Sequence, residues 1–93
     1  MTWTWDEDKS RANERKHGIT FETAALVFDD PLAVMRPDPF TVEERWQTIG
    51  MIEGLVVFVV HTWPDRAGEP GRIISARLAS AGERKEYQDG DFA

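Results

Sequence analysis

The sequence predicts one α+β domain in which an antiparallel sheet lies between helices at the two ends of the chain. Leu55–Val60 are apolar without a break and rich in valine, which predicts a central strand buried on both faces. Helix-capping residues flank this region: Asp6 near the start, and the capping box Ser80-x-x-Glu83 near the end. Because 93 residues leave room for one domain, residues 1–93 are assigned to a single unit.

The first thirty residues predict a short strand and two helices. Thr2–Trp5 alternates threonine with tryptophan, which is typical of a strand. A helix is expected over Glu7–Lys16, since acids occupy its first turn and Gly18 suits the left-handed position after its end. Thr20 caps a second helix. Its apolar residues recur with helical spacing at Phe21, Ala24, Ala25 and Phe28, and Asp29-Asp30-Pro31 ends it.

The middle of the chain predicts an antiparallel meander of three to four strands. Glu53-Gly54 is typical of a two-residue hairpin turn, because glycine readily takes a positive φ. The prolines and glycines of Pro64–Gly71 predict an exposed loop. The strands are expected at Leu32–Met35, Glu43–Ile52, Leu55–Trp63 and Arg72–Ala79.

The last strand and the last helix place the arginines. Regular alternation along the strand predicts that Arg72 and Arg77 point to opposite faces of the sheet, unless a bulge intervenes. The capped helix is expected to run from Ser80 to about Asp89. Residues 90–93 are expected to fray.

Composition excludes several classes of site. There is no cysteine, so disulfides and thiolate metal sites are absent. The two histidines lie far apart and no H-E-x-x-H motif occurs, so neither a metal nor a cofactor is expected. No apolar run reaches the ~20 residues of a membrane span and the N-terminus does not resemble a signal peptide, which favours a cytoplasmic protein.

Charge is distributed unevenly along the chain. The net charge of −6 argues against a general nucleic-acid binder. Residues 9–17 nevertheless hold lysines, arginines and a histidine against one acid, and residues 72–85 hold arginines and a lysine against Glu83. If these two segments meet in the fold, they form a local cationic site.

Several short motifs follow one another along the chain: W-D-E-x-K at Trp5–Lys9, K-H-G at Lys16–Gly18, F-E-x-A at Phe21–Ala24, F-D-D-P at Phe28–Pro31, E-R at Glu44-Arg45, R-I-I-S-A-R at Arg72–Arg77 and E-R-x-x-Y at Glu83–Tyr87. Taken in order, they resemble the BrnT family, small toxins of type II toxin–antitoxin pairs. The resemblance implies a RelE-like ribonuclease fold, RNA cleavage without metal, and growth arrest. It also implies neutralisation by a small antitoxin that binds DNA through a ribbon-helix-helix domain, so that DNA is contacted only through the antitoxin.

Metal-free RNA cleavage needs a base for the 2′-OH proton, cations for the phosphate and an acid for the leaving 5′-oxygen. Arg77 and Arg72 are the first candidates for the phosphate, since a guanidinium pairs with phosphate oxygens and keeps its charge. Their alternative role is to form salt bridges with the many carboxylates. His61 is a candidate acid or base, although a histidine that ends an apolar run is also typical of a core. Lys16 is a candidate phosphate contact or base, or a solvated residue at a helix end.

Further residues are candidates for binding RNA. Tyr87 could stack on a base or pack against the sheet. Two functions compete with the ribonuclease: a non-catalytic module that binds RNA or an acidic protein through the same cations, and a structural partner subunit whose arginines form interface salt bridges. The candidates for RNA binding are Arg45, Arg84, Lys85 and Tyr87.

Overall fold

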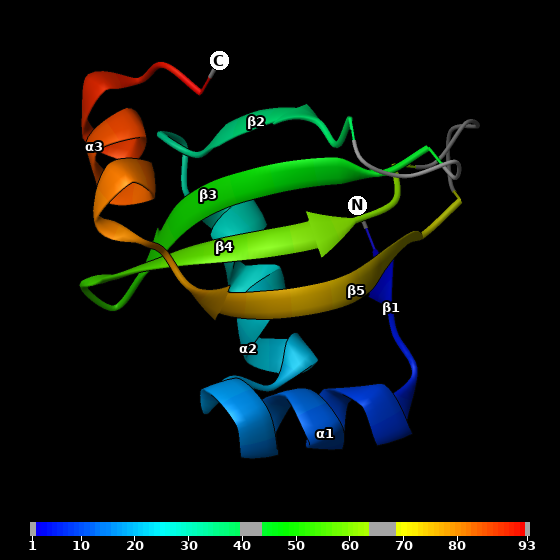
Figure 1. The fold of residues 1–93 in the computed structure, drawn as a ribbon. Coiled ribbons are helices and arrows are strands. Elements are labelled where there is room, and N and C mark those ends of the chain that lie inside the picture. The colour runs from blue at the N-terminus through cyan, green and yellow to red at the C-terminus, as the bar shows by residue number, and fades with distance from the viewer. Residues whose placement is uncertain (1, 40–43, 64–68, 93) are drawn as a thin grey trace.

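A five-stranded sheet organises the part of the chain that this computed structural model describes, residues 2–39, 44–63 and 69–92 (Figure 1). The strands lie side by side in the order β1-β5-β4-β3-β2. The elements in chain order are β1 (Trp3–Thr4), α1 (Glu7–His17), α2 (Phe21–Ala24), the 3₁₀ helix η1 (Ala25–Asp29), β2 (Val34–Pro37), β3 (Trp46–Ile52), β4 (Leu55–His61), β5 (Gly71–Leu78) and α3 (Ala81–Asp89).

The predicted α+β class and the antiparallel meander are confirmed. Strands β2 to β5 pair antiparallel in sequence order, and β4 is the central strand, as its valine run predicts. The N-terminal strand β1 joins the sheet by pairing parallel with the start of β5. Helices α1 and α2 cover one face, here called the helix face, whereas α3 lies toward the opposite face at one end (Figure 1).

Local signals fix the turns and helix ends that the sequence predicts. The Asp6 carboxylate accepts hydrogen bonds from the first turn of α1, and Gly18 ends that helix at φ 76°. Glu53 and Gly54 form the β3–β4 turn at φ 47° and 84°.

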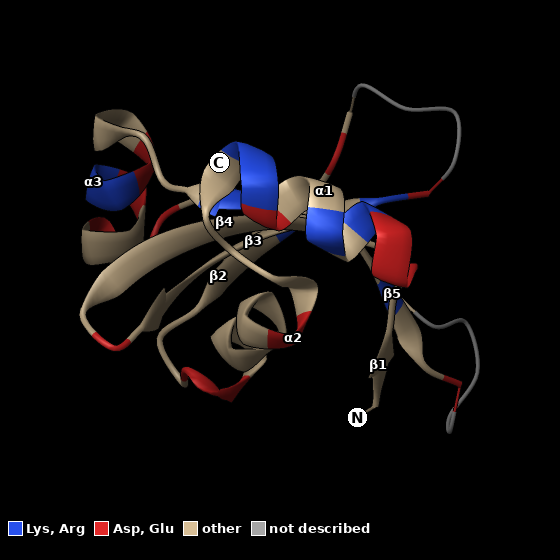
Figure 2. Ribbon diagram, turned by 90° about the horizontal axis from the view of Figure 1, so that it is seen from below, with Lys and Arg blue, Asp and Glu red and all other residues tan. Residues whose placement is uncertain are grey.

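Lysines and arginines follow the length of α1, and its first turn is acidic (Figure 2). Strand β2 begins at Val34 and β3 at Trp46, both later than predicted. Residues 40–43, which include the predicted start of the second of these strands, and residues 64–68 of the predicted exposed loop lie outside the described part.

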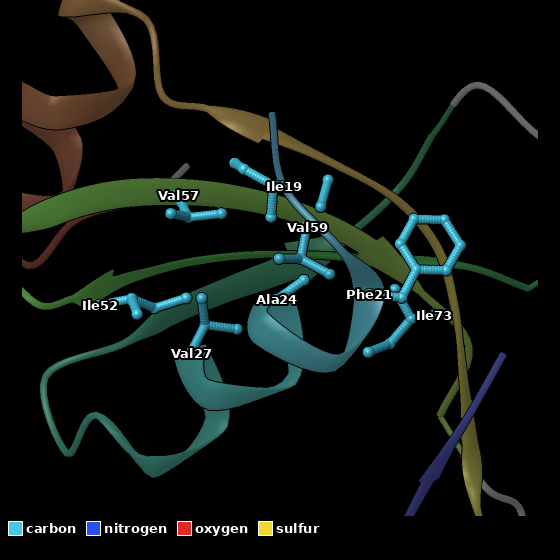
Figure 3. Close-up of a cluster of buried hydrophobic side chains, with 9 residues drawn as sticks. Ile19, Phe21, Ala24, Val27, Ile52, Val57, Val59 and Ile73 are labelled. Carbon is cyan, nitrogen blue, oxygen red and sulfur yellow. The ribbon is translucent and has the colours of Figure 1, made fainter. Parts of the chain in front are cut away.

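The core of the helix face lies between the second helix and the sheet (Figure 3). The predicted stripe is present: Phe21 and Ala24 are buried, and Ala25 and Phe28 pack against the same core. Val27 joins them, because the helix tightens from α2 into the three residues per turn of η1. At Gly50, an added Cβ would lie 2.9 Å from both Cβ and the carbonyl oxygen of Val27, so β3 and η1 pack in backbone contact. The buried cluster comprises Ile19, Phe21, Ala24, Val27, Ile52, Val57, Val59, Ile73 and Ala76.

The side chain of Asn13 joins α1 to the outer edge of β5. Its amide nitrogen donates to the carbonyl oxygens of Ile19 and Ala76, each at 2.8 Å, and its oxygen accepts from the Ala76 N–H at 3.3 Å. The two bonds to Ala76 are those that a neighbouring strand would make. The N–H and carbonyl of Ala76 are therefore both hydrogen-bonded although no strand pairs with β5 there. The edge of β5 is therefore closed at Ala76.

A bulge in β5 corrects the prediction that Arg72 and Arg77 point to opposite faces. His61 pairs with Ile73 and Val60 pairs with Ser75, which leaves Ile74 as the extra residue. Ile73 and Ala76 consequently belong to the same buried cluster, which regular alternation would forbid. The bulge therefore lets Arg72 and Arg77 point to the same side, opposite the helix face.

The second face of the sheet, here called the arginine face, carries a smaller core that includes the C-terminal segment. Phe92 is 8% exposed and lies edge-on to Phe58, with ring centroids 6.4 Å apart. The expected fraying of residues 90–93 is therefore wrong at Phe92, because its ring is buried against Phe58 and under the guanidinium of Arg36. This cluster comprises Ile49, Phe58, Ala79 and Phe92.

Candidate functional site

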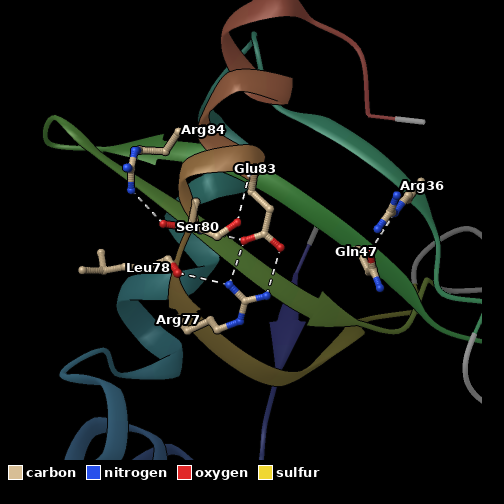
Figure 4. Close-up of polar contacts among 8 residues, drawn as sticks. Arg36, Gln47, Arg77, Leu78, Ser80, Glu83 and Arg84 are labelled. Carbon is tan, nitrogen blue, oxygen red and sulfur yellow. Dashed lines mark hydrogen bonds and ion pairs between the residues drawn. The ribbon is translucent and has the colours of Figure 1, made fainter.

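Arg77 lies on the arginine face near the end of β5, and its guanidinium is held from several sides (Figure 4). Its Nη1 and Nη2 donate to the two carboxylate oxygens of Glu83 at 2.7 and 2.9 Å. Nη1 also donates to the carbonyl oxygen of Leu78 at 3.2 Å. The Cζ atom stands 4.2 Å from the centre of the Phe58 ring, a cation–π contact. The fork is thus oriented before any ligand arrives.

The pair of Arg77 and Glu83 stays ionised at neutral pH. The bond from Glu83 raises the pKa of Arg77 further. Burial alone would raise the pKa of Glu83, but hydrogen bonds from Arg77 and Ser80 outweigh it and lower that pKa. The arginine side chain is 40% exposed, and its Nε and the outer hydrogen of Nη2 have no partner among the described residues. This second edge of the guanidinium can donate hydrogen bonds to two oxygens of one phosphate.

The role of Glu83 in holding Arg77 was not predicted. The sequence identifies Glu83 as a capping-box residue, and the box is present: Glu83 Oε1 accepts from the Ser80 N–H at 2.8 Å, and the Ser80 hydroxyl accepts from the Glu83 N–H. The same carboxylate also binds Arg77, so the start of α3 and the end of β5 are fixed together. The signal that could have indicated this is the sequence separation of six residues between Arg77 and Glu83, which keeps the two side chains within reach of each other.

Two predicted residues, Arg72 and Arg45, come together at the other end of β5. They line a small cavity of about 80 Å³ with Asp6 and Lys9 from the start of α1. Ile73 and Ile74, at the bulge, complete the lining. The two basic segments found in the sequence therefore meet along β5, because Lys9 comes from the first and Arg72 from the second.

His61 lies on the opposite side of the sheet from Arg77. Its side chain is fully buried, edge-on to the rings of Trp3 and Phe28 at centroid distances of 5.1 and 4.8 Å. Nε2 lies 2.6 Å from the Thr48 hydroxyl and Nδ1 lies 2.9 Å from the Thr62 carbonyl oxygen, so Nδ1 carries the hydrogen and Nε2 accepts one. Burial lowers the pKa of His61 to about 4 against the opposing effect of the bond to Thr62, and the ring is neutral at pH 7.

The remaining candidates lie on the two outer helices. On α3, Arg84 donates to the Ala79 carbonyl oxygen at 3.0 Å, and Lys85 forms an exposed ion pair with Asp89 at 2.9 Å. The Tyr87 hydroxyl donates to the Asp30 carboxylate at 2.6 Å, and this bond raises the pKa of Tyr87 to about 12. On α1, Lys16 lines an open groove of about 270 Å³ against Ile74 and Ser75 of β5.

Arg36 is a cation of the arginine face that the sequence did not single out. Its Cζ lies 4.1 Å from the centre of the Phe92 ring, and its Nε donates to the Gln47 side chain at 2.8 Å (Figure 4). Strand pairing aligns Arg36 with Gln47 on β2 and β3. Across the described residues, no group of three His, Asp or Glu side chains is placed to hold a metal ion, and no helix is long and apolar enough to cross a membrane.

Comparison with known proteins identifies the family. The family model described as "Ribonuclease toxin, BrnT, of type II toxin-antitoxin system" matches residues 5–83, from the residue before the cap of α1 to the carboxylate that holds Arg77. No curated protein matched the chain at a significant level. A type II system implies an antitoxin as partner and RNA as the target of its ribonuclease. Because the match covers most of the sequence, this chain belongs to the BrnT family of ribonuclease toxins of type II toxin–antitoxin systems.

Proposed function

We propose that this protein is a metal-independent endoribonuclease that holds the scissile phosphate of RNA on Arg77 and thereby arrests growth. The observation that carries the proposal is the guanidinium of Arg77, which is fixed by Glu83 and Phe58 and still has one open edge. A charge that is oriented before the reaction stabilises the transition state without further reorganisation. Arg72 shares the same side of the sheet and is the second candidate cation.

In the proposed reaction, the 2′-oxygen of the RNA attacks the adjacent phosphorus and the bond to the 5′-oxygen breaks. The products are a 2′,3′-cyclic phosphate and a free 5′-hydroxyl. The 2′-OH loses its proton to a base, and the leaving 5′-oxygen gains one from an acid. Arg77 neutralises the added charge on the pentavalent phosphate, which is the contribution that a metal ion would otherwise make.

The proton transfers are assigned to exposed groups and water. His61 is left out of the proposed site, since its ring is buried on the helix face and both nitrogens are bonded within the protein. Tyr87 is held by Asp30. Lys16, the other candidate base, is exposed, and so is Glu44 beside Arg45; the amine of the first and the carboxylate of the second are the candidate proton carriers beside water.

The proposal extends to the partner and the compartment. The toxin acts in the cytoplasm, and a ribbon-helix-helix antitoxin neutralises it by covering the arginine face or its rim, where cations can accept acidic side chains. DNA is bound through the antitoxin alone. A cross-linking map of the complex tests this point, and antitoxin contacts confined to the helix face would contradict direct blocking of Arg77.

The decisive experiment compares RNA cleavage by the wild-type protein and Arg77→Ala in buffer containing EDTA. Wild-type protein should cleave, and Arg77→Ala should lose about 10²–10³-fold in single-turnover rate, or ~3–4 kcal/mol of transition-state stabilisation. Both proteins should show a cooperative thermal transition. Arg11→Ala is the matched control, because Arg11 also pairs with a carboxylate, Asp8, but lies on exposed α1. A variant at Arg77 that is folded and cleaves at the wild-type rate would refute the assignment.

A second function has one observation in its favour. Glu83 offsets the charge of Arg77, which suits an RNA-binding module without turnover as well as an enzyme. In that case wild-type protein would bind RNA and fail to cleave it under any of these conditions. The same experiment therefore separates the two functions.

A further inference from the structure

An open groove follows the outer edge of β5, where α1 packs beside the strand. It has a volume of about 270 Å³, and its lining combines Ala12 and Lys16 of α1 with Ile74 and Ser75 of β5. Phe21 adds to the apolar part of the lining, and the exposed Lys9, Lys16 and His17 form its rim. Asn13 also lines the groove, but both of its amide hydrogens are already donated to backbone carbonyls.

Two lysines, Lys9 and Lys16, belong to this rim. They are seven residues apart on α1, which places them roughly 20° apart around the helix and about 10.5 Å apart along it. Glu14 lies roughly 160° from Lys16 by the same periodicity, so the groove side of α1 is free of that acid. Both lysines are exposed, and neither side chain forms a hydrogen bond or ion pair with a described residue.

The groove adjoins the small cavity at Arg72 and follows the edge of β5 toward Arg77. Lys9 and Ile74 also line the small cavity at Arg72. Ser75 precedes Arg77 by two residues, about 7 Å along the strand. Lys9, Lys16 and Arg72 therefore lie along the same edge of β5, the strand that carries Arg77.

We propose that this groove binds the sugar–phosphate backbone of single-stranded RNA next to the cleavage site, with Lys9 and Lys16 each contacting a different phosphate. The inference rests on the proposed function, because it names where the rest of the substrate lies. RNA fits better than a peptide, since Asn13 closes the edge of β5 at Ala76 and a peptide cannot add a strand there. The apolar part of the lining suits the faces of riboses and bases.

The test measures binding separately from cleavage. The probe is a single-stranded 2′-O-methyl RNA, which lacks the nucleophile and stays intact, and its affinity is measured over a range of salt concentrations. Each phosphate contact to a single strand contributes about −0.7 to the slope of log K against log salt. The double variant Lys9→Gln/Lys16→Gln should therefore reduce the magnitude of the slope by about 1.4.

A control on the same helix changes the net charge equally. The double variant Arg11→Gln/Arg15→Gln removes two cations that lie opposite Asn13, and thus point away from the sheet. Its salt slope should match the wild type. With cleavable RNA, the lysine variant should lose kcat/KM, and the arginine variant should keep the kcat/KM of the wild type.

The outcomes are distinct. An equal loss of slope in both double variants would mean non-specific attraction and would overturn the proposal. A lysine variant that binds RNA normally and loses its antitoxin would also overturn it, and would assign the groove to an acidic protein segment. Lysine-dependent RNA binding by a protein that never cleaves RNA would support the groove and refute the ribonuclease function.

Discussion

His61 and Arg77 lie on adjacent strands and opposite faces of one sheet, and they illustrate two uses of a titratable side chain. His61 on the helix face is fully buried, with both ring nitrogens bonded inside the protein. Arg77 on the arginine face is held as firmly, yet it keeps one edge of its guanidinium exposed. The first arrangement stabilises the fold, and the second is ready to bind an anion.

The difference teaches that orientation alone does not make a functional group. Both side chains are fixed by neighbours, Thr48 for His61 and Glu83 for Arg77. Only Arg77 retains both its charge at neutral pH and access to solvent. Mutations on the two faces should therefore separate effects on stability from effects on cleavage.

The largest expected effect on stability comes from His61→Ala. It removes a fully buried ring and leaves the Thr48 hydroxyl without its partner, and such changes cost about 3 kcal/mol. Chemical denaturation should show this loss, whereas the cleavage rate per folded molecule should stay near the wild type. A stable His61→Ala protein with a strongly reduced rate would place His61 in catalysis and break the contrast.

The pH dependence of stability should report the same buried ring. The folded state holds the pKa of His61 at about 4, below its ordinary value of 6.5, so the unfolded state binds the proton more readily. Stability is therefore full above pH 6.5 and is lost as pH falls toward 4, by about 2 kcal/mol between pH 7 and pH 5. Urea unfolding at these two pH values measures it. His61→Gln should remove this loss, and an unchanged dependence in that variant would assign it to other groups.

A smaller effect, this time on cleavage, is expected for Glu83→Gln. The amide oxygen can still accept from the Ser80 N–H, so the helix cap survives, but Arg77 loses its charged partner. We expect the single-turnover rate to fall about tenfold, which corresponds to ~1.4 kcal/mol.

Two controls make the Glu83 result interpretable. Asp89→Asn on the same helix removes the exposed pair with Lys85 and should leave the rate unchanged. In an Arg77→Ala background, Glu83→Gln should have no further effect if Glu83 acts through Arg77. Additive losses would instead indicate an independent role for Glu83.

The smallest effect is expected at Tyr87, the single tyrosine of the chain. Its bond to Asp30 raises its pKa to about 12, so the absorbance change of tyrosinate should appear about two pH units above that of a free tyrosine. Asp30→Asn should return the transition toward pH 10. Tyr87→Phe should cost about 1 kcal/mol of stability and leave RNA affinity unchanged. A clear loss of RNA affinity would show that the ring stacks on a base.

Features determined by neighbouring residues could be predicted from the sequence. The helix caps at Asp6, Gly18 and Ser80 and the turn at Glu53-Gly54 depend on a few adjacent side chains and φ angles. The central strand Leu55–His61 could also be predicted, because an unbroken apolar run is buried on both faces only in the interior of a sheet.

Features that depend on distant contacts were missed. The bulge at Ile74 follows from how His61 and Ile73 pair across two strands, and it reverses the predicted orientation of Arg72 relative to Arg77. Burial of Phe92 depends on a ring provided by Phe58, thirty-four positions earlier. In the candidate site, Arg77 could be identified from its position near the end of a strand. Its partner Glu83 was missed, because the capping box already explained why a glutamate occurs at that position.

The close packing of Gly50 against Val27 has a consequence for the genetics of this toxin. Any other residue at Gly50 would force its Cβ to within 2.9 Å of the backbone of η1, and an added Cβ at Gly71 would lie 2.3 Å from the ring of Trp3. In a selection for cells that survive expression of the toxin, escape mutations should therefore accumulate at these two glycines as well as at Arg77. The glycine mutants should be recovered as degraded or insoluble protein, whereas the Arg77 mutants should accumulate as intact protein that still binds the antitoxin.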